Sequence, residues 1–347
     1  MIAEQERTKD FYEQAKKKMK NKSANLELLE KTTNALSLVE CLVIEGLNFI
    51  FKGGTSLTIL LDDIKRFSID VDIITEESKE RTRELINLII SHQNLFYKVE
   101  ENIRNNATSK MMDIEHYKFY YISKITGKEN NILLDIAYEK NVYPEIVSSK
   151  IELDKFDIYS DTYVKTPSIE SILGDKLTVL ATNSVGIHYG TEKELELMKQ
   201  LYDVDKLFNQ VERVDIVIKS FVGTSNKELK YRKQVELTYK DVLEDIREFC
   251  DDVIIPEREH DSEISSGLRK IAGYVLESNF SRDQKALTAA SKVLYLTKII
   301  ESGENDIERY HEGCQFENKE IPDKYKIRMK KMRVYNEEAY YYMLKGI

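Results

Sequence analysis

The sequence predicts an α+β protein in two parts, a lobe with a mixed β-sheet over residues 1–165 and an all-helical lobe over 166–347. Strand-like runs alternate with helical patterns in the first part, whereas the second shows helical spacing throughout. The chain of 347 residues suffices for two ordinary domains, each with its own core. Only 4 prolines and 13 glycines favour long regular elements over irregular loops.

In the first lobe, helices and short strands follow one another. Leucine and valine recur at helical spacing over residues 24–45, and Gly46 can end that helix. Residues 49–51 form a short apolar run, which predicts a buried strand before a glycine-rich turn. Alternation of apolar and polar side chains over 67–75 predicts a second strand. Further expected elements are a helix over 77–92 and strands around 96–100, 117–123 and 132–138.

The second lobe opens with Thr166-Pro167, which is typical of a helix start. We expect Thr166 to be the N-cap and Pro167 to be the first helical residue. Helical spacing then continues to near the end of the chain, so no sheet is expected in this lobe. The predicted helices cover 168–182, 192–208, 210–221, 227–250, 262–278, 282–301 and 323–345.

Composition and charge narrow the class of protein. The net charge of −9 is unlike that of a dedicated nucleic-acid-binding protein, although six basic residues gather between Lys324 and Arg333. No apolar stretch is long enough to span a membrane, and the charged residues 1–7 do not resemble a secretory signal. Three scattered cysteines fit a reducing compartment. We therefore expect a cytoplasmic protein with no membrane partner.

A glycine turn followed by two aspartates predicts the chemistry most directly. Gly53 and Gly54 allow the backbone to approach a phosphate, and the N–H groups of the next turn can bind its oxygens. Ser56 adds a hydroxyl near the same phosphates. Asp70 and Asp72, two apart on the predicted strand, face the same way, and close carboxylates repel unless a cation lies between them. This combination predicts phosphoryl transfer with two Mg²⁺ ions.

A third carboxylate is expected on a neighbouring strand. Asp135 interrupts an otherwise apolar run over residues 131–137, and a carboxylate in such surroundings needs a partner. We expect it to bind the catalytic metal ion and to assist deprotonation of an attacking hydroxyl. A strand-end aspartate with backbone partners is the alternative. The five histidines show no metal-ligand spacing, so no structural zinc is expected, and His188 is expected in a surface loop.

Four segments resemble three motifs of a known family. Lys52–Leu57 (KGGTSL) and Arg66–Asp72 (RFSIDVD) resemble the signature of the AbiEii/AbiGii abortive-infection toxins, which include the MenT toxins. Thr166–Leu177 resembles the family's second motif, and Lys199–Asp205 its RDLYD-like final motif. The resemblance covers roughly residues 30–210 and implies a polymerase-β-like nucleotidyltransferase fold for the first lobe.

The resemblance also implies roles for particular residues. Lys176 would be the cation that binds the triphosphate, and Asp203 the family's essential late aspartate, both brought to the cleft by the helical lobe. Lys199-Gln200 replaces the usual Arg-Asp, so the first carboxylate of the late motif is missing. The expected metal ligands are Asp70, Asp72 and Asp135. The expected catalytic residues are these three aspartates together with Lys176 and Asp203. The expected nucleotide-binding residues are Lys52, Gly53, Gly54, Ser56, Ser68 and Lys176.

The function implied by the resemblance is that of a nucleotidyltransferase toxin of a toxin–antitoxin system in phage defence. An acceptor hydroxyl, on the 3′ end of a tRNA, would attack the α-phosphorus of an NTP and so block aminoacylation. A cognate antitoxin, often a winged-helix AbiEi-like protein, is the expected partner. Two alternatives stay open. One is nucleotidylation of a protein or of a small molecule such as an aminoglycoside, which the acidic net charge favours, and the other is a nucleotide-binding module without turnover.

Overall fold

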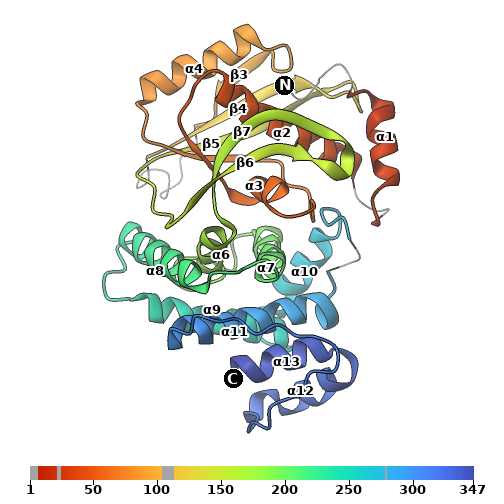
Figure 1. The fold of residues 1–347 in the computed structure, drawn as a ribbon, viewed down its shortest axis with the longest axis vertical. Coiled ribbons are helices and arrows are strands. Elements are labelled where there is room, and N and C mark those ends of the chain that lie inside the picture. The colour runs from red at the N-terminus through yellow and green to blue at the C-terminus, as the bar shows by residue number, and fades with distance from the viewer. Residues whose placement is uncertain (1–6, 22–24, 104–112, 278–279) are drawn as a thin grey trace. The chain divides into compact units, whose positions relative to one another are not determined.

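The structure, a computed structural model, describes residues 7–21, 25–103, 113–277 and 280–347 (Figure 1). It confirms the predicted α+β class with a mixed sheet and a helical second half. Residues 1–6, on which the expected absence of a secretory signal depends, lie outside the described residues. The chain divides into two compact units. Unit 1 comprises Met1–Ser168 and Gly273–Ser278, and unit 2 comprises Ile169–Ala272 and Asn279–Ile347.

Unit 1 is built around a five-stranded sheet in the order β1-β2-β5-β4-β3. The central strands β2 (Val71–Thr75) and β5 (Glu129–Tyr138) run parallel to each other, and all other neighbours in this sheet are antiparallel. One edge is β1 (Ile50–Lys52), and the other is β3 (Lys98–Glu101), which pairs with β4 (Ile114–Ile122). Each of these strands overlaps a run in which the sequence predicts a strand, but their starts differ from the prediction by one to three residues or, for β2, by four.

One face of this sheet packs against α2 (Leu26–Ile44) and α4 (Lys79–His92) and forms the core of unit 1. Phe51, Ile73 and Ile136 are paired across β1, β2 and β5, and all three are buried on this face. Each contributes on the order of 1.5–3 kcal/mol by burial. Because side chains alternate along a strand, the residues next to these three point to the opposite face.

The first helices begin and end as their sequences indicate. In α1 (Lys9–Lys17), the side chain of Thr8 accepts a hydrogen bond from the backbone of the first turn. In α2, Asn25 caps the first turn in the same way, and Gly46 ends the helix with a φ of +84°. The helix predicted over 24–45 is therefore confirmed to within two residues at its start.

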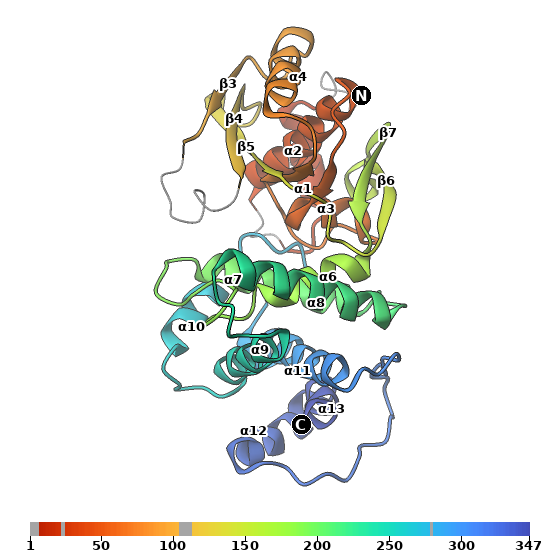
Figure 2. The same ribbon diagram turned by 90° about the vertical axis from the view of Figure 1, so that its left-hand side faces the viewer.

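A two-stranded hairpin next to α2 is absent from the sequence-based prediction. It consists of β6 (Ile146–Leu153) and β7 (Ile158–Pro167), joined by the 3-10 turn η2 (Asp154–Phe156). Figure 2 shows α2 between this hairpin and the strands β3, β4 and β5. The predicted helix start at Thr166-Pro167 is wrong, because both residues pair with β6 and the helix begins at Ile169. A proline is tolerated at the end of an edge strand, where its missing N–H is not needed.

A short segment from the second half of the sequence also belongs to unit 1. The helix predicted over 262–278 is α10 (Asp261–Ile271), and the chain then contributes Gly273–Ser278 to unit 1. The backbone N–H of Phe67 donates to the Tyr274 carbonyl at 2.8 Å. Phe67 therefore pairs with this segment and lies outside β2. The strand predicted over 67–75 is shortened to Val71–Thr75.

Unit 2 consists, in its described residues, of helices and the segments that join them. The central helix α11 (Leu287–Ser302) is almost wholly buried and contacts three others. Gly174 allows two further helices to approach closely, because a Cβ there would lie 2.6 Å from the backbone nitrogen of Phe221. The other elements are α6 (Ile169–Thr178), α7 (Glu194–Phe208), α8 (Val214–Tyr231), α9 (Tyr239–Ile254), the π-helical turn η3 (Arg282–Ala286), α12 (Asp323–Tyr335) and α13 (Glu337–Gly346).

Helix boundaries in unit 2 differ from the prediction at several places, and the helix predicted over 168–182 already ends at Thr178. The helix α8 spans the interval that was expected to separate helices at 210–221 and 227–250. The single helix predicted over 323–345 is two, because Asn336 adopts an extended conformation and caps α13 with its side chain. Within the described part of the chain, no helix is long and apolar enough to cross a membrane.

Candidate functional site

Four polar residues form a row across the sheet of unit 1, on the face opposite its core. Lys52 of β1 pairs with Asp72 of β2, Asp72 with Asp135 of β5, and Asp135 with His116 of β4. Directly paired residues point to the same side of a sheet, and neighbouring strands lie about 4.8 Å apart. We call these four residues the polar row. It brings two of the three predicted metal ligands together on neighbouring strands.

The glycine turn lies directly against the polar row. The helix α3 (Gly53–Leu60) begins at the first glycine, without the intervening turn that the sequence suggested. Gly53 has a φ of +78°, and a Cβ at this position would lie 2.2 Å from Oδ2 of Asp72. Lys52 is the N-cap and makes no side-chain capping bond. The first N–H groups of α3 are therefore suited to bind anionic oxygens beside the Asp72 carboxylate.

The second glycine lies against two residues of the following segment. A Cβ on Gly54 would lie 2.6 Å from Nη2 of Arg66 and 2.9 Å from Oγ of Ser68. Thr55 Oγ1 is 2.9 Å from the same serine hydroxyl, so α3 is tied to the segment that leads into β2. Arg66, to which the sequence analysis gave no role, is buried and donates from Nη1 to the Phe67 carbonyl at 2.8 Å. Its guanidinium places a positive charge beside the turn expected to bind phosphate.

Two other predicted site residues lie outside the polar row. Asp70 precedes β2 by one residue and is exposed, so it is on the same segment as Asp72 but not on the strand itself. Ser56 is fully buried, and its hydroxyl donates to the Gly53 carbonyl at 2.9 Å. In this structure that hydroxyl stabilises the first turn of α3.

The carboxylates suit a magnesium ion whose coordination is completed by a substrate. Mg²⁺ is commonly held by one or two carboxylates, by water and by substrate phosphates. Asp72 and Asp135 are both partly exposed on one face of the sheet, and Asp70 lies two residues before the first of them. Among the described residues, no three His, Cys, Asp or Glu side chains form a metal site by themselves. The donor set therefore fits an ion that is bound jointly with a nucleotide.

His116 makes a contact that the sequence analysis did not anticipate. Its Nδ1 lies 2.7 Å from Oδ1 of Asp135, and its side chain is only 10% exposed, against 26% for the aspartate. The two residues are 19 positions apart in the sequence. Only the register of β4 against β5 brings them together, so spacing along the chain carries no signal of the pair.

In unit 2, Lys176 of the second motif and Asp203 of the final motif form a buried ion pair. Nζ of Lys176, on α6, lies 2.8 Å from Oδ2 of Asp203, on α7, and both side chains are at most 5% exposed. Lys176 also donates to Oε1 of Gln200 at 2.7 Å. Gln200 occupies the position at which the resemblance implies an aspartate. Because its amide is neutral, it adds no negative charge beside Lys176. The positive charge of Lys176 is thus compensated within the unit.

A second buried lysine engages the next aspartate of α7. Nζ of Lys292, on α11, lies 2.8 Å from Oδ1 of Asp205 and 2.9 Å from Oε1 of Glu338. Burial alone would raise the pKa of Asp205, but Lys292 and Lys206 outweigh it and hold the pKa below its usual value. Burial likewise opposes the charge of Lys292, and its carboxylate partners raise its pKa. These contacts fasten α7 to α11 and α13.

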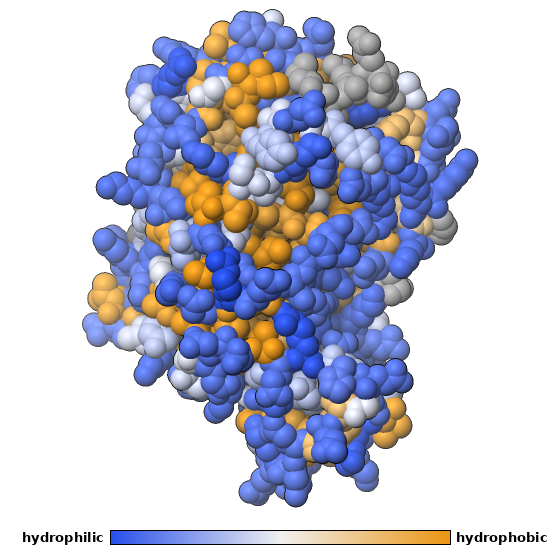
Figure 3. Space-filling view, in the orientation of Figure 1, coloured by the Kyte–Doolittle hydropathy of each residue, from blue (hydrophilic) through white to orange (hydrophobic). Residues whose placement is uncertain are grey.

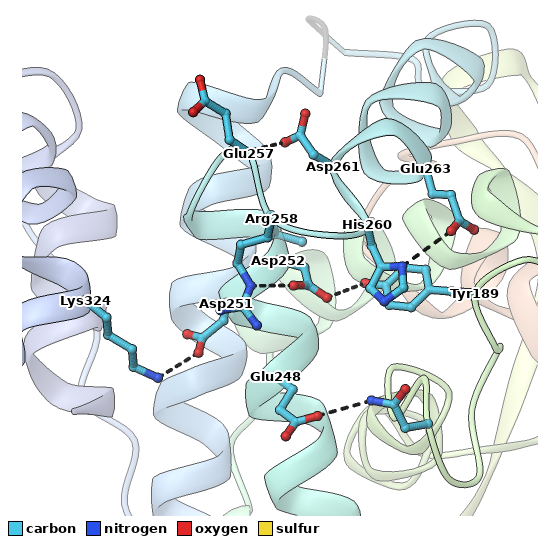
Figure 4. A network of polar contacts seen from close by, with 12 residues as sticks. Tyr189, Glu248, Asp251, Asp252, Glu257, Arg258, His260, Asp261, Glu263 and Lys324 are labelled. Carbon is cyan, nitrogen blue, oxygen red and sulfur yellow. Dashed lines mark hydrogen bonds and ion pairs between the residues drawn. The ribbon is translucent and has the colours of Figure 1, made fainter.

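The loop between α6 and α7 is held by a polar network (Figure 4). The ring of Tyr189 stacks on that of His260 with centroids 3.7 Å apart, and its hydroxyl donates to Asp252 at 3.1 Å. Nε of Arg258 donates to the same carboxylate at 2.6 Å. The exposed His188 lies with Nδ1 2.8 Å from a carbonyl of its own loop. Its contacts therefore support the loop conformation.

Several solved structures match the chain at low sequence identity. JHP933 from Helicobacter pylori is 17% identical, with a TM-score of 0.47 over 81% of this chain and 96% of that chain. A second H. pylori protein, provisionally titled a nucleotidyltransferase, is 16% identical, with a TM-score of 0.48 over 80% and 96%. An antigenic nucleotidyltransferase-like protein from Paracoccidioides brasiliensis is 13% identical, with a TM-score of 0.39 over 61% and 93%.

Comparison with protein families assigns most of the chain. A search of curated proteins found no match. Residues 37–274 match the family described as nucleotidyl transferase AbiEii toxin, Type IV TA system. The matched range includes the polar row, the glycine turn and the Lys176–Asp203 pair. The chain therefore belongs to the AbiEii family of nucleotidyl transferase toxins of Type IV toxin–antitoxin systems.

Proposed function

We propose that this chain transfers a nucleoside monophosphate from an NTP to the 3′ end of a tRNA, in a reaction that depends on Mg²⁺. The observation that carries the proposal is the close approach of Gly53 to Asp72, where a Cβ would lie 2.2 Å from the carboxylate. This approach supports the proposal, because a helix start that is suited to bind phosphate lies beside the carboxylate that we propose as a metal ligand. Family membership supports the reaction type, and the polar row supports its location on the sheet.

Asp70, Asp72 and Asp135 are the residues that would hold the metal ions. When bound, Mg²⁺ would offset the charge of the triphosphate and lower the pKa of the attacking hydroxyl. The N–H groups at the start of α3 and the side chain of Lys52 would bind phosphate oxygens. Arg66 beside Gly54 would add a positive charge at the same turn.

The transfer itself is a displacement at the α-phosphorus. The acceptor hydroxyl oxygen forms a bond to this phosphorus as the bond to the bridging oxygen of the β-phosphate breaks, and pyrophosphate leaves. Asp135 would accept the hydroxyl proton, because it lies in the polar row next to Asp72 and is partly exposed.

The role that the resemblance implies for Lys176 is to bind the triphosphate, and we retain it as part of the proposal. Its charge is compensated by Asp203 at 2.8 Å. Binding of a phosphate by Lys176 would therefore require the lysine to exchange or share its carboxylate partner. Both members of this pair lie within the range that matches the family.

Basic side chains on α12 support an RNA acceptor, but less strongly than their number in the sequence suggests. Three of the six engage carboxylates of this chain, through the pairs Lys324–Asp251, Lys326–Asp323 and Arg328–Asp283. Lys330 and Lys331 are exposed on the same helix. Figure 3 shows the end of the chain that contains α12 as mostly hydrophilic. We propose that Lys330 and Lys331 contact the RNA backbone.

We also propose a cognate antitoxin, of the winged-helix AbiEi-like kind, and a role in cytoplasmic defence against phage. The support is the description of the family as a Type IV toxin–antitoxin system. Expression of the chain alone should arrest growth, and co-expression of the antitoxin encoded beside it should restore growth. Growth that is unaffected by the chain alone would contradict the toxin assignment.

The test of the proposed reaction uses each of the four α-labelled NTPs with total RNA, cell protein and small molecules as acceptors. We expect label in tRNA when Mg²⁺ is present and none when it is chelated. Asp72→Asn, which keeps the size of the side chain, is the matched inactive control. Label in protein or in a small molecule would support those acceptors in place of tRNA. Nucleotide binding without any labelled product would support the non-catalytic alternative.

A further inference from the structure

His116 forms the end of the polar row that is farthest from the glycine turn. The order across the sheet is Lys52, Asp72, Asp135 and His116, so three strand pairings separate the histidine from α3. His116 contacts Asp135 alone among the row, through the 2.7 Å distance between Nδ1 and Oδ1. Any effect of His116 on a reaction at the row would therefore pass through the Asp135 carboxylate.

The short distance between Nδ1 and Oδ1 is that of a hydrogen bond. An ionised carboxylate has no proton to donate, so with Asp135 ionised the donor is Nδ1 of His116. The donated bond holds Oδ1 of Asp135 on the side of the carboxylate that faces β4. Without such a donor, repulsion from the neighbouring Asp72 carboxylate would favour rotation of Asp135 away from it.

The surroundings of Nε2, the other ring nitrogen, indicate that His116 does more than fill space on the sheet. Nε2 is buried, and among the described residues no partner lies within hydrogen-bonding distance of it. A buried polar atom without a partner costs about 1–3 kcal/mol, a cost that an apolar ring would not have. The benefit of a histidine at this position must therefore come from Nδ1 and its contact with Asp135.

A second histidine–carboxylate pair in unit 1 offers a comparison. His92 lies with Nδ1 3.1 Å from Oε2 of Glu45, and its side chain is 54% exposed. Exposed pairs of this kind contribute little and restrict neither partner strongly. His116 differs in its burial and in the position of its partner within the polar row.

We propose that His116 is a positioning residue for nucleotidyl transfer, whose Nδ1–H holds the Asp135 carboxylate beside Asp72. The inference rests on the proposed function, in which Asp135 binds the metal ion and accepts the hydroxyl proton. Fixing one carboxylate oxygen in advance reduces the reorganisation needed when substrate and metal ion bind. His116 itself contacts neither of them.

The test compares two substitutions that differ in a single property. His116→Phe keeps a buried ring but removes the donor, whereas His116→Asn keeps an N–H donor close to the position of Nδ1. We expect His116→Phe to lower kcat by about 10–100-fold and to weaken Mn²⁺ binding, measured by calorimetry in the presence of a non-hydrolysable NTP analogue, by about tenfold. KM for the NTP should change by less than about twofold, because the phosphate-binding turn lies at the other end of the row. His116→Asn should restore both kcat and Mn²⁺ binding to within a few-fold of the wild type.

His92→Phe is the matched control, because it removes the other histidine–carboxylate pair of unit 1, and it should change neither kcat nor Mn²⁺ binding. Thermal melting of every variant checks the fold, and His116→Leu replaces His116→Phe if the latter does not fold. Wild-type kcat and Mn²⁺ binding in a folded variant without the donor would overturn the inference. A folded His116→Asn that is no more active than His116→Phe would also overturn it.

Asp135→Asn distinguishes failure of the proposed function from failure of the role of His116. If Asp135→Asn stays active, the proposed role of Asp135 fails. If it is inactive while His116→Phe is active, only the role of His116 fails.

Discussion

The polar row of unit 1 and the buried ion pairs of unit 2 both contain motif aspartates, in opposite surroundings. Asp72 and Asp135 are paired on neighbouring strands and are partly exposed. Asp203 and Asp205 are buried on α7, and each lies 2.8 Å from the ammonium group of a lysine. In unit 1 two carboxylates are neighbours on adjacent strands, whereas in unit 2 each of these two carboxylates contacts a buried lysine.

This difference indicates which motif residues are suited to bind an external cation. Neighbouring, partly exposed carboxylates are stabilised by an added metal ion. A buried aspartate that contacts a lysine is already compensated, and removal of either partner leaves a buried charge. The sequence motifs alone do not show which aspartates are partly exposed neighbours and which are buried beside a lysine, whereas the fold does.

Removing one of the proposed metal ligands on the segment of β2, Asp72 in the polar row or Asp70 just before the strand, should have the largest effect. Asp70→Ala and Asp72→Ala are each expected to lower the transfer rate by at least about a thousandfold and to relieve growth arrest. The melting temperature without metal should stay nearly the same, because Asp70 is exposed and Asp72 is partly exposed. Transfer assays and thermal melts measure both effects. Full activity in either variant would contradict the metal assignment and remove the contrast with unit 2.

Gly53→Ala tests the contact between the glycine turn and the row. The new Cβ would meet Oδ2 of Asp72 and would require a left-handed backbone, so we expect kcat/KM to fall by about a hundredfold. Gly46→Ala is the matched control, because Gly46 has a φ of +84° but open space around its Cα. It should lose stability of about 1 kcal/mol and keep its activity. Equal activity in the two variants would show that the close approach of turn and carboxylate is unimportant.

The Lys176–Asp203 pair tests whether a buried ion pair of unit 2 serves only stability or also binds the nucleotide. Lys176→Ala leaves Asp203 buried without its lysine, and we expect a loss of about 3–5 kcal/mol in the free energy of unfolding, measured by denaturant titration. The double variant Lys176→Met with Asp203→Leu should recover most of that stability. If Lys176 binds the triphosphate as proposed, the double variant keeps a raised KM for the NTP. Recovery of a normal KM would make the pair purely structural, like Lys292–Asp205.

Acid should weaken unit 2 through Asp205. The folded-state pKa of this carboxyl lies below its ordinary value, because Lys292 and Lys206 outweigh burial. A lowered folded-state pKa stabilises the fold above the unfolded pKa of about 4, and this stability is lost as the pH falls toward the folded-state value. We expect the melting temperature to drop below about pH 4, and the drop to be smaller in Asp205→Asn paired with Lys292→Met. An identical pH profile in that variant would exclude Asp205 as a cause.

The smallest effect is expected at α12. Lys330→Glu with Lys331→Glu should raise KM for tRNA a few-fold and flatten its dependence on salt, without change in KM for the NTP. The effect is small because three neighbouring cations already engage carboxylates of the chain. The exposed Lys240 and Lys298, reversed together, are the control for net charge. If both double variants bind tRNA equally well, acceptor recognition does not involve α12.

Much of the sheet could be predicted from the sequence, because its strands follow their local pattern. Buried Val71 and Ile73 alternate with Asp72, and Asp135 stands out in an apolar run that proves to be β5. The hairpin β6–β7 was missed because its buried side chains are a mixture of apolar and polar residues. Ile158 and Val164 of β7 are buried, but so is Ser160, which donates to the Glu40 carboxylate of α2 and interrupts the apolar alternation.

Pairings between distant residues could not be predicted from local spacing. Ile271, Val275 and Leu276 have the spacing of a helix, yet backbone pairing of Leu276 with Lys65 draws this segment into unit 1. The contact of His116 with Asp135 depends on strand register in the same way. Local pattern therefore indicated the carboxylates of the candidate site, and only the fold indicated the residues that hold them.

The most direct test of the central claim asks which phosphate of the NTP reaches the acceptor and whether Asp72 is needed. Wild-type protein and Asp72→Asn are incubated with tRNA, Mg²⁺ and an NTP labelled at either the α- or the γ-phosphate. The account predicts that wild-type protein transfers only the α-label to tRNA and releases the γ-label as pyrophosphate, and that Asp72→Asn transfers neither. Transfer of the γ-label to the acceptor, or undiminished transfer by Asp72→Asn, would contradict it.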